Sequence, residues 1–237
     1  MPTARREWTG RIARVTIGAA ALVLLAGPAT RFGILPWKAG LGMFAVAALV
    51  AGIGGLFSVV ALLRRRGGLV AVIAAAAGVT AFAALLTTVA AGRAVPPIND
   101  ITTDPANPPA FVTITAATRG ADAGALSYDP SFAAQQAAAY PEVRPLIVEL
   151  PPAEVFPKML AAAESMDWAI VSSDPASGRI EATATVPWWG FKDDIVVVMS
   201  PDGIGTRVDV RSKSRVGKSD LGVNAARIQA YLGKIGG

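Results

Sequence analysis

The chain has 237 residues, 22 of them basic and 17 acidic, and contains neither cysteine nor histidine. Disulfides are therefore excluded, and zinc, haem and iron–sulfur cofactors, which depend on thiolate or imidazole ligands, are not expected. Residues 1–93 carry ten basic side chains and one acid, a net charge of +9, whereas residues 94–237 carry twelve and sixteen, a net charge of −4. Because the basic excess lies beside apolar stretches, no nucleic-acid partner is expected. A carboxylate site for Mg²⁺ or Ca²⁺ stays open.

Three stretches without a charged side chain fill most of the first 93 residues: Val15–Thr30, Ala39–Leu63 and Gly67–Gly92. A helix that crosses the hydrocarbon core needs about 20 apolar residues. The second and third stretches reach this length, and the first reaches it if Arg31 snorkels and the span continues to Leu35. We therefore predict a transmembrane anchor over residues 1–93, in contact with the lipid bilayer. Its expected spans are 12–35, 40–63 and 68–91.

Basic clusters predict the orientation of these spans. They are Arg5, Arg6, Arg11 and Arg14 before the first span, and Arg64–Arg66 between the second and third. Three spans place both clusters on one side, which the positive-inside rule makes cytoplasmic. The expected location is thus the bacterial inner membrane, with several spans, a cytoplasmic N-terminus and a periplasmic C-terminal domain. Alternatively, Val15–Ala26 is the core of a cleaved signal peptide, which leaves the orientation of the remainder unchanged.

Small residues recur at helical spacing in two spans: Ala47, Ala51 and Gly55 in the second, and Ala76, Thr80, Ala84 and Thr88 in the third. Such faces let helix backbones approach closely in lipid. They pack within the anchor or, alternatively, form a docking face for another membrane protein. Ion and proton pathways need ionisable side chains inside the membrane, and these three stretches hold none, so we expect an anchor rather than a transporter.

The tail begins with a proline-rich segment, residues 94–115, which cannot be helical and is expected to form an extended strap. Residues 111–115 alternate and favour an edge strand. Polar strap residues either satisfy backbone groups or bind a cation; they are Asn99, Asp100, Thr102 and Asp104. A loop over residues 116–130 and a short helix from a Ser131 cap to Tyr140 are expected next.

The remaining pattern predicts an α+β domain, which we place at residues 116–237. The expected elements are a strand at 146–150, a helix at 153–166, strands at 168–172, 179–186, 194–199 and 206–214, and a helix from an Asp220 cap to Lys234. Tight turns between the strands favour a mostly antiparallel sheet covered by helices. The pattern turns four residues of one strand outward, namely Arg207, Asp209, Arg211 and Lys213. It gives the last helix an apolar face of Val223, Ala226, Ile228 and Tyr231.

Three blocks of the tail carry a family resemblance: Ile-Asn-Asp-Ile-Thr-Thr-Asp at 98–104 with Pro108–Pro109, Trp-Gly-Phe-Lys-Asp-Asp at 189–194, and residues 209–224 followed by Arg227–Ile228. In this order they resemble the domain-of-unknown-function family 1499, over about residues 96–235. Residues 14–93 are similar to the membrane region that often precedes this domain in alphaproteobacteria. The resemblance implies a non-cytoplasmic domain and no particular activity.

The richest polar cluster runs from a strand end into a helix N-terminus. Its candidate anion-binding or ligand-binding residues are Arg211, Lys213, Arg215, Lys218 and Ser219. Free N–H groups and partial positive charge at a helix start suit an anion. Alternatively, the segment is a solvated strand end with an ordinary cap. Ser212 or Ser214 with Lys213 or Lys218 would be a candidate nucleophilic pair, and no catalytic residue or metal ligand is assigned.

Two further pairs are singled out. Asp193 and Asp194 point to opposite faces if they lie in a strand, and one is expected to pair with Arg211 or Arg215. Together with Asp220 and Asn224 they are assigned structural polar roles. Trp188 and Trp189 lie at a hairpin tip and are candidate contacts for a partner or the membrane interface.

The function that these features favour is a non-enzymatic one. We expect a membrane-anchored periplasmic binding or accessory/assembly subunit of a larger membrane protein complex, with another membrane protein as partner. A lipid-binding or anionic-ligand-binding domain is the alternative, and a Ser–Lys hydrolase is less favoured.

Overall fold

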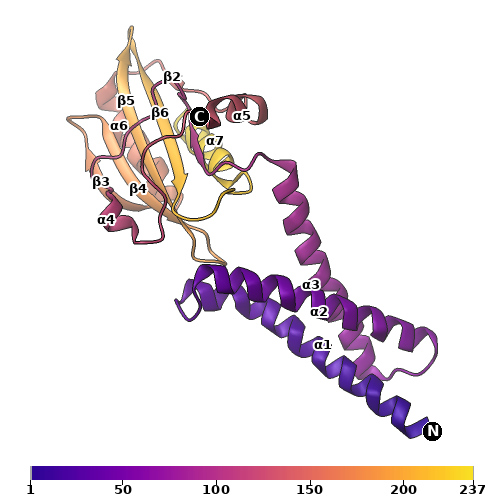
Figure 1. Cartoon of the computed structure of the whole chain (residues 1–237). Helices are drawn as coiled ribbons and strands as arrows, with labels where there is room; N and C mark the ends of the chain where they lie inside the picture. The colour runs from indigo at the N-terminus through magenta and orange to yellow at the C-terminus, as the bar shows by residue number, and fades with distance from the viewer. Residues whose placement is uncertain (1, 237) are drawn as a thin grey trace. The chain divides into compact units, whose positions relative to one another are not determined.

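The computed structural model describes residues 2–236 of the chain (Figure 1). Two compact units are present. The first comprises the helical region up to Arg93 and the short segment Pro187–Gly190, and the second comprises Ala94–Val186 and Phe191 onward. Each unit is described by itself below.

Three long helices form the first unit: α1 (Pro2–Arg31), α2 (Trp37–Leu63) and α3 (Leu69–Ala94). Their apolar segments of 25, 27 and 26 residues are long enough to cross a membrane, which confirms the three predicted membrane-capable helices. Helix α1 ends at Arg31 instead of continuing to Leu35. The cause is Gly33, whose φ of +71° lets the amides of Gly33 and Ile34 bond back to Thr30 and Ala29.

Small residues govern how these helices pack. Helices α1 and α2 lie side by side as a hairpin (Figure 1), and the predicted face of Ala47, Ala51 and Gly55 is buried as expected. A Cβ on Gly55 would lie 3.0 Å from the Cα of Gly78. The crossing of α2 and α3 therefore requires glycine at both positions.

The face predicted for α3 does not pack within the anchor, and its alternative role as a docking face for another membrane protein stays a prediction. Ala76, Thr80 and Thr88 are exposed, and Ala84 is only half-buried. The residues that pack instead are Ala71, Ala74, Ala75, Gly78 and Ala81. The close approach at Gly78 fixes the rotation of the helix, and spacing alone cannot identify that approach among so many alanines.

The second unit is built on a six-stranded antiparallel sheet, which confirms the predicted α+β class. The strands are β1 (Asp100–Thr102), β2 (Leu146–Val148), β3 (Ala169–Asp174), β4 (Arg179–Thr185), β5 (Lys192–Asp202) and β6 (Gly205–Ser214). Their order is β1-β6-β5-β4-β3, and β2 also pairs with β6. Strands β3 to β6 form a meander of hairpins, as the turn residues predict.

One face of the sheet carries the apolar core. Helices α6 (Pro152–Ser165) and α7 (Val223–Gly236) cover it (Figure 1), and Trp168 stacks on Tyr231 with ring centroids 4.7 Å apart. Ile228 and Tyr231 point inward as predicted. Val223 and Ala226, however, are exposed, and the buried positions are Asn224, Ala225 and Ile235. Helix α7 starts only after Gly222, whose φ is +82°, so its inner face starts one residue later.

The opposite face is polar and is covered as well. The segment 103–130, including a one-turn helix α4 (Ala116–Arg119), lies over it. Asp209, Arg211 and Lys213, predicted to point outward, do lie on this face but are buried. The predicted strand at 111–115 does not form; the edge strand is β1 instead. Helix α5 (Phe132–Ala139) follows the predicted bounds. The Gln136 side chain donates a hydrogen bond to the Thr102 carbonyl and accepts one from the Thr102 amide.

Candidate functional site: a buried ionic layer

Asp100 forms the first centre of an ionic layer on the polar face of the sheet. It lies in β1, its side chain is fully buried, and its carboxylate accepts two bonds from Arg211, at 2.9 and 2.8 Å. Lys213 Nζ donates a third bond at 2.7 Å. The strand register explains this geometry, because Asp100 lies opposite Lys213 on β6 and two residues from the partner of Arg211. One buried carboxylate thus binds two cations.

Arg211 also binds residues 103–130, the covering segment, to the sheet. Its Nη1 donates to the carbonyl of Pro109 at 3.2 Å and its Nη2 to that of Leu126 at 2.7 Å. The guanidinium lies 5.2 Å from the ring of Phe111 and 5.6 Å from that of Tyr128. Cation–π contacts of this kind strengthen when the cation is desolvated. Arg211 is therefore held by one ion pair, two carbonyls and two rings.

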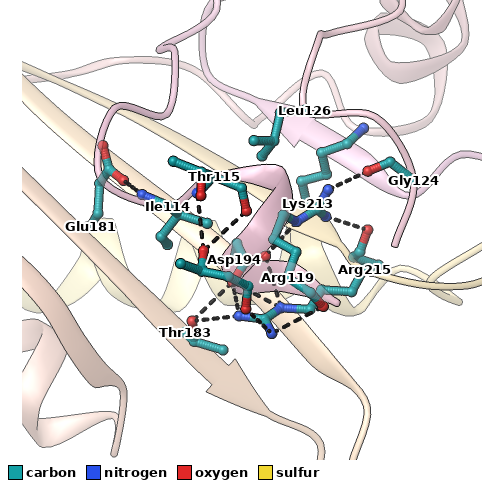
Figure 2. A network of polar contacts seen from close by, with 12 residues as sticks. Ile114, Thr115, Arg119, Gly124, Leu126, Glu181, Thr183, Asp194, Lys213 and Arg215 are labelled. Carbon is teal, nitrogen blue, oxygen red and sulfur yellow. Dashed lines mark hydrogen bonds and ion pairs between the residues drawn. The ribbon is translucent and has the colours of Figure 1, made fainter. Parts of the chain in front are cut away.

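Asp194 is the second centre, seen in Figure 2. It lies on β5, is fully buried, and accepts from Arg119 Nε at 2.7 Å, Arg215 Nη2 at 2.8 Å and Thr183 Oγ1 at 2.9 Å. Arg119 belongs to α4, and its remaining donors reach the carbonyls of Gly124 and Ser214 at 2.5 and 3.1 Å. This ion pair fastens the middle of the covering segment onto the sheet.

Glu181 is the third centre, and all of its hydrogen bonds are to backbone amides. Its carboxylate on β4 accepts from the amides of Val112, Thr113 and Ile114 at 2.6, 3.0 and 2.7 Å; Figure 2 shows the bond to Ile114. The side chain is completely buried. A carboxylate that accepts several amide hydrogen bonds satisfies the backbone of a segment much as a neighbouring strand would. This is why residues 111–115 form no strand.

A more exposed pair closes the edge of the layer. Arg207 donates to Asp209 at 2.6 Å and to Asp104 at 2.8 Å, and Asp209 also accepts from Thr103 Oγ1 at 2.8 Å. The hydrogen bond that Arg207 donates to Asp209 raises the pKa of Arg207. Arg179 adds a longer contact of 3.7 Å to Glu181.

Asp193 and Asn224 lie on the other face, as the alternation of β5 requires. Arg227 Nη2 donates to Asp193 at 2.6 Å, and Ser212 Oγ donates to Asn224 Oδ1 at 2.7 Å. The predicted divergence of Asp193 and Asp194 and the pairing of Asp194 with Arg215 are both present in the structure. Asp220 bonds the amides of Gly222 and Asn224 at 2.9 and 2.7 Å, and its burial raises its pKa.

The predicted anion-binding residues do not converge on a common space. Arg211 and Lys213 bind Asp100, and Arg215 binds Asp194. Lys218 is exposed in the loop before α7, and Ser219 Oγ accepts from the amide of Leu221 at 3.2 Å. The basic charges that predicted an anion are thus directed at carboxylates from distant parts of the chain.

A Ser–Lys pair built on Lys213 is also incompatible with the strand. Ser212 and Ser214 are the immediate neighbours of Lys213 on β6, so their side chains project to the opposite face. There Ser212 bonds Asn224 and Ser214 accepts from the same amide. All three side chains are buried.

The hairpin tip between β4 and β5 carries the two tryptophans. Residues 187–189 form the turn, Gly190 has a φ of +72°, and the amide of Val186 bonds the carbonyl of Phe191 at 2.8 Å. The Trp188 side chain is 46% exposed, whereas Trp189 is half-buried. The Trp188 ring lies against Gly27 of α1, and the Trp189 ring lies edge-on to that of Phe44, with centroids 5.6 Å apart. The part of Trp188 that stays exposed is of the residue type that protein contacts favour.

Two buried hydroxyls have no hydrogen-bond partner in the described part of the chain, those of Tyr128 and Tyr140. Burial raises the pKa of Tyr128 to about 12, and the nearby Asp100 carboxylate adds to this shift. Burial also raises the pKa of Tyr140. Among residues 2–236, no group of three or more His, Cys, Asp or Glu side chains is arranged to hold a metal ion.

Sequence reasoning missed Arg119, Glu181 and the central role of Asp100. Asp100 was noticed only as one polar residue in the strap, and Arg119 lies in a stretch of small residues that predicts a loop. The usable signal was the excess of basic side chains on the outward face of β6, since charges on one strand face need counter-charges when that face is covered.

The comparison with protein-family models gives one family. The model of a family described as protein of unknown function (DUF1499) matches residues 100–235, a range that contains every ion pair described above. No curated protein matches the sequence. Three membrane-capable helices precede the matched region. Because the match covers more than half of its length, the chain belongs to the DUF1499 family of proteins of unknown function.

Proposed function

We propose that the protein is a membrane-anchored accessory or assembly subunit of a larger membrane protein complex, whose domain binds a partner rather than converting a substrate. One observation carries the proposal: Arg211, Lys213 and Arg215 are each bound to a buried carboxylate. The polar cluster is therefore closed by the protein itself, and its charges are used to fasten the covering segment. Anion binding at this cluster is less favoured, because each of these three cations is already bound to a carboxylate.

The surface offers a contact of a different kind. Trp188 is 46% exposed at the tip of the β4–β5 hairpin, and interfaces between proteins are enriched in tryptophan. With the arginine clusters of the anchor on the cytoplasmic side, the domain faces the periplasm, so we propose a second inner-membrane protein as the partner.

Native purification tests this proposal. Full-length protein, extracted in a mild detergent from cells that express it at its normal level, is expected to migrate as part of a larger assembly. Trp188→Ala is expected to weaken that assembly by at least about tenfold in affinity, the usual loss at a central interface tryptophan. Ile204→Ala is the matched control, since Ile204 is 96% exposed at the tip of the next hairpin. A chain that migrates alone, or an equal loss in both variants, would contradict the proposal.

A further inference from the structure

The turn between α2 and α3 has an unusual residue at its tightest point. The amide of Arg66 bonds the carbonyl of Ala61 and that of Arg65 bonds Leu62, both at 2.8 Å, and Arg65 has a φ of +53°. Glycine is the residue that this helix-ending motif favours, and Gly33 takes the equivalent place after α1. At the α2 end the chain instead keeps three consecutive arginines, Arg64–Arg66.

Two of these arginines line a cavity. It has a volume of about 170 Å³ and lies between the end of α2 and the start of α1, with Arg64 and Arg66 beside Thr9, Ile12, Phe57 and Ser58. A second hollow of about 340 Å³ runs along the same two helices. It shares Ile12 and Phe57 with the first, and its walls include Val15, Val50 and Ile53. The charged opening thus adjoins a mainly apolar groove, whose lining also includes Trp8 and Arg11.

The charges at this opening lack a counter-charge in the described structure. Neither Arg64 nor Arg66 forms an ion pair within residues 2–236, and Glu7 is the only acid among the first 93 residues. The domain differs, because there each buried cation meets a carboxylate. Since the turn ends two membrane-capable helices, it lies at the depth of the lipid headgroups.

We propose that the cavity binds the phosphate of an anionic phospholipid, with Arg64 and Arg66 on the phosphate and one acyl chain along Ile12 and Phe57. Guanidinium groups bind phosphate oxygens in pairs, and basic pockets between membrane helices take up anionic headgroups. The mainly apolar groove that adjoins the charged opening favours a lipid over a soluble phosphate. This site belongs to the anchor and does not depend on the proposed function of the domain.

The test uses the full-length protein in detergent and native mass spectrometry. Phosphatidylglycerol is titrated against phosphatidylcholine with the same acyl chains, and glycerol phosphate serves as the soluble anion. We expect a clear preference for phosphatidylglycerol. Arg64→Gln and Arg66→Gln should each weaken its binding by about fivefold, the effect of one basic residue near an anionic lipid surface.

Arg65→Gln is the control, because it removes the same charge from the same turn at a position outside the cavity. It should weaken binding by less than about twofold, and melting of all variants in detergent should match the wild type. An equal loss in the three variants would mean general charge attraction and would overturn the site. Equal binding of the two lipids, or equally tight binding of glycerol phosphate, would overturn it too.

Discussion

Single residues hold this domain together through charge that is hidden from water. Asp100 and Asp194 are fully buried, and each receives two cationic side chains. A buried ion pair adds little net stability relative to an apolar pair, but the loss of one partner leaves a desolvated charge. The layer is therefore sensitive to single substitutions, whereas the pair between Arg207 and Asp104 is partly solvated.

Asp100→Asn should lower the free energy of unfolding by about 3–5 kcal/mol, because Arg211 and Lys213 lose their shared anion. Thermal unfolding of the full-length protein in detergent, followed by near-ultraviolet circular dichroism, measures the change. Asp104→Asn makes the same chemical change at the exposed edge and should cost at most about 1 kcal/mol. Equal losses would show that the buried position confers no special role.

The tyrosines predict a pH dependence. The pKa of all three is raised by burial, that of Tyr128 from 10.0 to about 12. Because the folded state disfavours the phenolate, its contribution to stability is complete below pH 10.0 and is lost as the pH rises towards 12. Ultraviolet titration at pH 10 should find less phenolate in the folded protein than in the unfolded chain, whose tyrosines are about half ionised at that pH. Ionisation of a tyrosine at its ordinary pKa in the folded state would contradict the burial described here.

Elements were predicted well where one periodicity decides them. The alternation in β4 and β6 and the apolar spacing of α6 matched the structure because each has one face on the core. The covering segment was mispredicted, because Glu181 takes the place of a strand partner for Val112–Ile114. These residues are 67 to 69 positions away from Glu181, and no local pattern encodes such a pairing.

Glu181→Gln should release this segment. Gln offers one acceptor oxygen and an amide donor that faces three amide donors, so at least one buried N–H loses its partner, at about 1–3 kcal/mol. Hydrogen exchange of peptides that cover residues 111–115 should accelerate, whereas peptides from α7 should not change. Glu164→Gln, on the exposed side of α6, is the matched control. Unchanged protection at 111–115 would refute the role of Glu181.

The crossing of α2 and α3 makes an element-scale prediction in the anchor. A Cβ on Gly78 would lie 2.7 Å from the Cα of Gly55, so Gly78→Ala must push the helices apart. Overpacking of this kind costs about 1–3 kcal/mol. The melting temperature in detergent should fall, whereas Gly42→Ala on α2, where nothing lies within 4 Å, should leave it unchanged. Equal melting of both variants would show that the Gly55–Gly78 contact is not a packing constraint.

At the scale of the whole molecule, composition alone predicted a membrane anchor followed by an α+β domain. The lengths of the apolar stretches identify spans once the thickness of the bilayer is known. The order of the predicted helices and strands identifies the fold class. The site was less accessible: Asp194 with Arg215 could be anticipated from neighbouring strands, but the charges around Asp100 meet across 111 and 113 residues. The basic residues on the outward face of β6 therefore do not reveal from sequence whether they bind a carboxylate of the protein or a ligand.

The division of the chain by the bilayer is the claim on which the account depends most. Helix α3 lies between the Arg64–Arg66 turn and the domain, so the two must lie on opposite sides if α3 spans the membrane. The chain has no cysteine, so one introduced cysteine is the only site for a maleimide. Ile204→Cys in the domain and Arg65→Cys in the turn provide the two reporters.

Labelling of right-side-out membrane vesicles with a membrane-impermeant maleimide makes this measurement. We predict that Ile204→Cys is labelled in sealed vesicles and that Arg65→Cys is labelled only after detergent opens them. Labelling of both variants in sealed vesicles, or of Arg65→Cys alone, would contradict a three-span anchor with an external domain.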